Sequence, residues 1–131
     1  MCIRDCSIPL LHGTAKAASQ PLLQAVLRRI VRDEADHGTF GWAFFDWAGP
    51  LLDDEDRALL GQTADRFIGG IGRTWEALAQ QEQVTESEAH ALGWLGTGPY
   101  LALARRTLRQ QVMAPLRSRG IPVSEPAFLG G

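Results

Sequence analysis

Apolar residues recur along the chain at spacings of three and four, the period of an α-helix, and no stretch alternates with period two. Residues that favour turns or helix ends separate the apolar stripes, among them Pro21, Gly49-Pro50 and Gly120. We therefore predict an all-α fold. The predicted helices cover residues 1–18, residues 21–48, a long segment that opens at residues 53–56, a short segment over residues 85–94, and residues 99–119.

The first two predicted helices are joined by a short turn at Ser19-Gln20, so residues 1–48 are expected to form an antiparallel helical hairpin. Residues 49–123 are expected to form a helical extension that packs on this hairpin. Residues 124–131 are predicted to be a flexible tail.

Two ionisable residues fall on the apolar stripe of the second predicted helix. Glu34 and His37 lie between Ile30 and Gly41, and residues three apart on a helix are neighbours on one face. Both side chains are therefore expected to point together into the packed interior. A buried ionised glutamate costs several kcal/mol unless it is paired or bound to a metal. Because Glu-x-x-His is also the pattern by which helical bundles supply metal ligands, Glu34 and His37 are candidate ligands.

Asp5 is the third candidate ligand. It lies 14 residues before Ser19, and Glu34 lies 14 residues after Gln20. At about 1.5 Å of rise per residue, both acids are about 21 Å from the turn and level with each other. The hairpin is thus expected to place Asp5 opposite Glu34 and His37.

Residues 2–5 and residues 32–42, the latter containing Asp33-Glu34-Ala35-Asp36-His37, resemble the second helical hairpin of ferritin-like di-iron proteins. They are most similar to bacterial ferritin-like-domain proteins, in which a D-E-x-x-H motif precedes an aromatic-rich helix end. Here that end contains Phe40, Trp42 and Phe44. The resemblance covers residues 1–48 and implies that the fold is a fragment of a ferritin-like helical bundle.

In that family a complete site takes one Glu and one Glu-x-x-His from each of two hairpins. The resemblance implies that Glu34 and His37 ligate metal, while Asp5 stands where the family has Glu. The cofactor implied is iron, two ions in a complete site, or manganese, and the chemistry is that of an oxidase, an oxygenase or an iron-oxidising protein. Since Met1 lies four residues before Asp5, the first hairpin is expected to be missing. The partner is then an N-terminal half-domain or a second copy that forms a homodimer.

Two alternatives remain open. The stripe of residues 21–48 could be rotated, which would leave Glu34 on the surface to pair with Arg28 or Arg29, and Asp5 would be a first-turn acid that the helix dipole favours. The whole chain could also be a non-catalytic helical interaction module, a ferritin-like remnant without metal. If the first hairpin is missing, an isolated chain is expected to expose a large apolar surface on the inner face of the hairpin, the face predicted to carry Asp5, Glu34 and His37.

The charge and composition of the chain disfavour some classes of binding partner. A net charge of −2 disfavours nucleic acid and anionic membranes, which normally bind basic surfaces. No run approaches the roughly 20 apolar residues of a membrane span. Arg4 and Asp5 interrupt any apolar N-terminal run, so no signal peptide is predicted. Cys2 and Cys6 are expected to be reduced thiols, and the predicted location is cytoplasmic.

Overall fold

The computed structural model describes residues 2–81 and 85–130, and the side chains of residues 2–6 and of Asp36 are outside this description. All regular secondary structure in these ranges is helical, which confirms the all-α prediction, whereas the ferritin-like assignment stays a prediction. The elements are α1 (Cys2–Ala17), α2 (Pro21–Ala48), the 3₁₀ turn η1 (Gly49–Leu51), α3 (Asp54–Gln80), α4 (Glu86–Ala91), α5 (Thr97–Thr107), the π-helical segment η2 (Leu108–Met113), α6 (Ala114–Ser118) and the 3₁₀ turn η3 (Ala127–Leu129).

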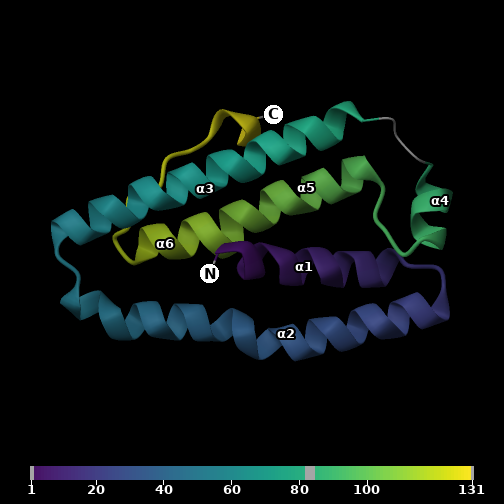
Figure 1. Cartoon of the computed structure of the whole chain (residues 1–131), viewed down its shortest axis with the longest axis horizontal. Coiled ribbons are helices and arrows are strands. Elements are labelled where there is room, and N and C mark those ends of the chain that lie inside the picture. Colours follow the sequence, from purple (N-terminus) through teal and green to yellow (C-terminus); the bar gives the residue numbers. More distant parts are fainter. Residues whose placement is uncertain (1, 82–84, 131) are drawn as a thin grey trace.

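Four helical rods lie side by side, in the order α3, α5 to α6, α1 and α2 (Figure 1). Helix α5, η2 and α6 continue one another and form the central rod, which α3 and α1 flank. Helix α2 packs on α1 and is the outermost rod. The segment after α6 crosses back over α3 (Figure 1).

Local sequence signals set most helix ends. Helix α2 begins at Pro21 and ends at Ala48, as predicted. Before α3 the side chain of Asp53 accepts from the backbone N–H of Asp56 at 2.8 Å, and the side chain of Asp56 accepts from the backbone N–H of Asp53 at 3.3 Å. The short helix α4 ends at Ala91, three residues earlier than predicted, because Gly93 adopts a left-handed φ of 74° and turns the chain.

The core is built around the central rod. Five apolar residues of this rod that recur at spacings of three and four are all buried there: Leu101, Ala104, Leu108, Val112 and Leu116. Three successive spacings of four residues would drift by about 40° a step around a helix of 3.6 residues per turn. The π-helical segment has wider turns with i to i+5 hydrogen bonds. It thus keeps the later residues of this series on the same side.

The prediction of a flexible tail at residues 124–131 is wrong for the described residues up to Gly130. Leu129 is buried, and Phe128 lies edge-on against Trp75 with 5.9 Å between ring centroids. The backbone N–H and hydroxyl of Ser124 donate to Asp65 at 2.9 and 2.6 Å. The segment is fixed because these contacts come from α3, more than 50 residues away, and no local pattern reports them.

Two glycines of α3 make room for this C-terminal segment. A β-carbon on Gly61 would collide with the backbone carbonyl of Pro122, and one on Gly72 would collide with the ring of Phe128. Gly61, Ala64, Ile68, Gly72 and Trp75 therefore form the buried face of α3, whereas Phe67 is exposed. The glycines allow close approach between α3 and the segment.

Helix α2 contributes to the core only through side chains that are partly buried, among them Trp42 and Phe45, which pack against the core cluster. It has 28 residues, and none of its described side chains is buried. In contrast α1, with 16 residues, buries Ala15 and contacts the central rod. At about 1.5 Å per residue, α2 extends about 18 Å further than α1 can cover.

Candidate functional site

Glu34 and His37 lie on the same side of α2 and contact each other. The Nδ1 atom of His37 is 3.3 Å from Oε2 of Glu34. The two side chains are thus neighbours, as their spacing predicts. The alternative in which Glu34 pairs with Arg28 or Arg29 does not occur among the described residues, because Glu34 pairs with His37 and Arg29 donates from Nε to Asp33 at 2.9 Å.

The prediction that both side chains point into the packed interior is wrong. The side chain of His37 is 55% exposed and that of Glu34 is 35% exposed. The reason is that α2 has more than one apolar side. Glu34 lies at the edge of the side that faces α1, and His37 lies further round, where no described element covers the helix.

Asp5 belongs to α1, but its side chain is outside the described residues, so its predicted position opposite Glu34 stays a prediction. Ile8 of α1 lies close to Gly38, the residue after His37. A β-carbon on Gly38 would come within 2.9 Å of Cδ1 of Ile8. Helix α1 therefore passes next to the turn that carries His37.

No group of three or more His, Cys, Asp or Glu side chains that could hold a metal ion is present in the part of the chain that the structure describes. The Glu34–His37 pair supplies two donors, one carboxylate and one imidazole. Two donors leave an ion largely hydrated, so a firm site needs further ligands from Asp5 or from a partner.

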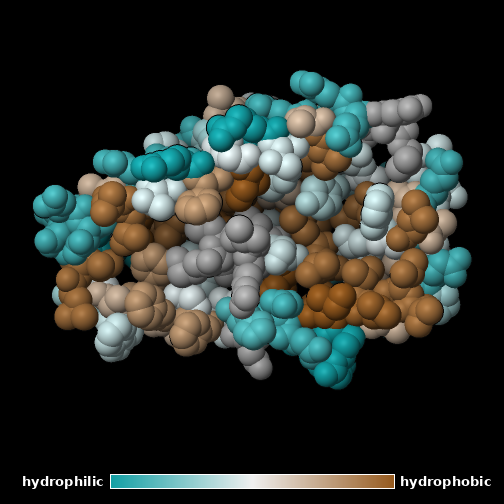
Figure 2. Space-filling view, in the orientation of Figure 1, coloured by the Kyte–Doolittle hydropathy of each residue, from teal (hydrophilic) through white to brown (hydrophobic). Residues whose placement is uncertain are grey.

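The exposed side of α2 carries a long apolar stripe. Its large side chains are between 36% exposed, at Leu23, and 75% exposed, at Leu22. Figure 2 shows apolar residues over both ends of α2 with hydrophilic residues between them. We call this surface the α2 stripe, and it consists of Leu22, Leu23, Val26, Ile30, Phe40, Phe44, Trp47 and, in η1, Leu51.

The α2 stripe is distinct from the side of α2 that packs on α1. At about 100° per residue, most of the stripe lies about a third of a turn away from the half-buried positions Leu27, Val31 and Gly38. Helix α2 is therefore apolar over two adjoining sides, and only one of them is covered. Phe44 and Trp47, with ring centroids 5.7 Å apart, form an exposed aromatic pair.

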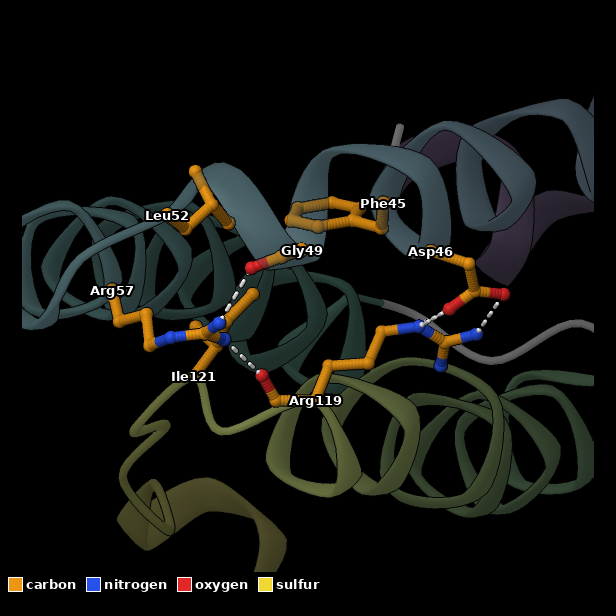
Figure 3. A pocket seen from close by; sticks show the side chains of 7 residues that line it. All are labelled: Phe45, Asp46, Gly49, Leu52, Arg57, Arg119 and Ile121. Atoms are coloured by element: carbon orange, nitrogen blue, oxygen red, sulfur yellow. Dashed lines mark hydrogen bonds and ion pairs between the residues drawn. The ribbon is translucent and has the colours of Figure 1, made fainter.

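A small pocket of about 140 Å³ lies where the end of α2, the start of α3 and the end of α6 meet (Figure 3). Arg57 donates to the backbone carbonyls of Gly49 at 2.7 Å and Arg119 at 2.5 Å. Arg119 in turn donates to both oxygens of Asp46 at 2.7 and 3.0 Å, and its guanidinium lies 4.9 Å from the centroid of Trp42. The two guanidinium groups connect the end of α2, the start of α3 and the end of α6, so the pocket is a structural junction.

Hydrogen bonds from Arg119 hold the pKa of Asp46 below its usual range. A carboxylate whose pKa is lowered on folding stabilises the fold above its unfolded pKa of about 4. This contribution is lost as the pH falls through the lowered pKa. The Asp46–Arg119 pair therefore weakens in acid and is intact at neutral pH.

No family model, no curated protein and no solved structure matches this chain. Within the described ranges, no helix has both the length and the apolar character needed to cross a bilayer.

The aromatic residues near the end of α2 give a signal that periodicity does not resolve. Phe40, Trp42, Phe44, Phe45 and Trp47 surround the helix instead of sharing one face. The structure half-buries Trp42 and Phe45 and exposes the other three. Apolar residues on several sides of one helix could have indicated a second contact surface.

Proposed function

We propose that the chain is a helical interaction module and that the α2 stripe is its association surface. The observation that carries this proposal is a 28-residue helix with no buried side chain among those described and eight exposed large apolar residues on it and on the following turn. Exposed apolar surface on this scale, here in two apolar segments of one helix separated by a polar turn, marks interaction sites in folded proteins. Scattered single residues would carry no such argument.

The stripe has the composition of a contact surface. Aromatic side chains dominate the binding energy of many interfaces, and Phe40, Phe44 and Trp47 occupy one half of it. Burial of apolar surface contributes about 25 cal/mol per Å². Each exposed aromatic ring here offers on the order of 100 Å² to a partner. Covering the stripe would thus stabilise both the complex and α2 itself.

Binding of an apolar naphthalene sulfonate dye to dilute protein tests this surface without any partner. Wild type is expected to give strong dye fluorescence, and the Phe44→Asp, Trp47→Asp double variant is expected to lose most of it. Phe67→Asp is the matched control, because Phe67 is equally exposed but lies on α3, and it should keep most of the signal. Equal fluorescence from wild type and the double variant would contradict the proposal.

A ferritin-like metal half-site is the second candidate function, and the contact between Glu34 and His37 favours it. The two side chains converge to 3.3 Å on one side of α2, as a Glu-x-x-His ligand pair requires. With Asp5 the chain would supply three ligands for iron or manganese. A di-iron site draws four carboxylates and two histidines from four helices, so a second hairpin must complete it.

Anaerobic ferrous titration tests this candidate. Dilute monomer is expected to bind iron weakly, because three ligands offset little of the ion's desolvation, and the associated form is expected to bind more tightly. Glu34→Ala should abolish that gain, whereas Glu76→Ala is the control, because Glu76 is an exposed carboxylate on α3 and lies outside the α2 stripe. Tight binding by the dilute monomer, or equal binding by Glu34→Ala, would show that the ligands are misassigned.

A further inference from the structure

The α2 stripe is chemically divided at its middle. Its first half is aliphatic, with Leu22, Leu23, Val26 and Ile30, and the part of its second half within α2 is aromatic. Between them lies a polar turn in which Asp33 pairs with Arg29 and Glu34 contacts His37. A partner that covers the stripe must therefore be apolar at both ends and polar in the middle.

A second copy of α2 in the opposite direction meets this requirement. Ala35 is next to the midpoint of α2, and Val26 and Phe44 lie nine residues on either side of it. Ile30 and Phe40 lie five residues on either side. We propose that the occupant of the α2 stripe is a second copy of this chain, whose α2 packs antiparallel about a twofold axis at the level of Ala35.

In this arrangement the aliphatic residues Leu23, Val26 and Ile30 of one copy face aromatic residues of the other, whereas Leu22 faces Ala48. Val26 packs on Phe44 of the second copy, and Ile30 packs on Phe40. Large side chains thus meet smaller ones, which permits the close packing that protein interiors require. A parallel pair would instead place aromatic on aromatic and aliphatic on aliphatic.

The polar turns also meet polar turns. Asp33 and His37 lie two residues on either side of Ala35, so the imidazole of one copy faces the carboxylate of the other. An antiparallel arrangement further opposes the two helix dipoles. No apolar end of the stripe is left against a charged residue.

The area is sufficient for a dimer. Three exposed aromatic and five exposed aliphatic side chains form the stripe. At about 100 Å² for each aromatic residue, with the aliphatic residues added, it approaches the roughly 800 Å² per partner of a standard interface. This inference rests on the proposed function, because it names the partner of the same surface.

Cysteine cross-linking tests the arrangement, in a background in which Cys2→Ser and Cys6→Ser remove the native thiols. A mixture of the Val26→Cys and Phe44→Cys proteins is expected to form a disulfide-linked heterodimer under mild oxidation. Each variant alone should not cross-link, because residues nine positions from the axis are about 27 Å from their own symmetry mates along the helix. The Phe67→Cys protein, with its thiol on α3, is the control for random collision.

The possible outcomes separate the two proposals. The 26–44 cross-link, with both single variants unlinked, supports the twofold antiparallel pair. Efficient 26–26 and 44–44 cross-links would show a parallel pair and overturn it. If no variant cross-links above the Phe67→Cys control while dilute wild type still binds the apolar dye, the second copy is the wrong occupant and the association surface stands. If dye binding also fails, the proposed function fails with it.

Discussion

Replacing Gly61 with alanine is expected to lower the free energy of unfolding by about 2 kcal/mol, the range of overpacking in a tight core. Gly61 lies on the buried face of α3, where a β-carbon would collide with the backbone carbonyl of Pro122. A carbonyl cannot rotate away as a flexible side chain can. The C-terminal segment would have to move, and with it the buried residues Ile121, Val123 and Leu129.

The same helix contains the matched control. A β-carbon on Gly69 would meet only a guanidinium nitrogen of Arg73, at 3.8 Å. Gly69→Ala should therefore raise stability by about 0.5 to 1 kcal/mol, the usual gain from removing glycine from a helix interior. Urea unfolding measures both effects. Gly61→Ala at or above wild-type stability would contradict this account of the segment.

Several other contacts hold the C-terminal segment in place, and we expect them to break together when the segment is displaced. Arg109 donates to Glu125 at 3.0 Å and also to the backbone carbonyl of Leu129, and Arg117 donates to the carbonyl of Val123 at 3.0 and 2.9 Å. Hydrogen bonds from both arginines hold the pKa of Glu125 below its usual range. Displacing the segment at Pro122 would strain these bonds together.

Helix ends were predictable because they depend on neighbouring residues. Pro21 opens α2, Asp53 and Thr85 cap α3 and α4, and Gly120 takes a left-handed φ of 74° after α6. Each signal acts within one turn of the helix that it ends. The buried face of the central rod was predictable for the same reason, since its period is local.

The packing of the C-terminal segment depends on contacts distant in sequence and could not be predicted from its own composition. Its signal is in α3, where Gly61 and Gly72 lie eleven residues apart, three turns along one face. Glycines at helical spacing indicate close approach by another part of the chain. In the last predicted helix, buried apolar residues recur every four residues from Ala104 to Leu116, and the π-helical segment lies within this series.

The contact between Glu34 and His37 was predictable from the sequence, but the solvent exposure of the two side chains was not. Spacing alone places Glu34 beside His37, and the structure brings their atoms to 3.3 Å. Whether that side of α2 is covered depends on the rest of the fold. Because α2 is apolar on two adjoining sides, periodicity could not tell which one faces α1.

Phe44→Asp is expected to abolish self-association of the chain. In the antiparallel pair the ring of Phe44 lies against Val26 of the second copy, and a carboxylate there would lose its water without gaining a partner. Leaving such a group unsatisfied costs about 2 to 3 kcal/mol. The twofold axis places the substitution in the interface twice, so the dissociation constant should rise by about a thousandfold or more.

Sedimentation velocity over a concentration series tests the α2 stripe most directly. Wild type is expected to pass from monomer to dimer by tens of micromolar, and Phe67→Asp, altered on α3, should follow the same curve. Phe44→Asp should remain at the monomer sedimentation coefficient throughout the series. A wild type that stays monomeric at all these concentrations, or a Phe44→Asp variant that dimerises as wild type does, would contradict self-association through the α2 stripe.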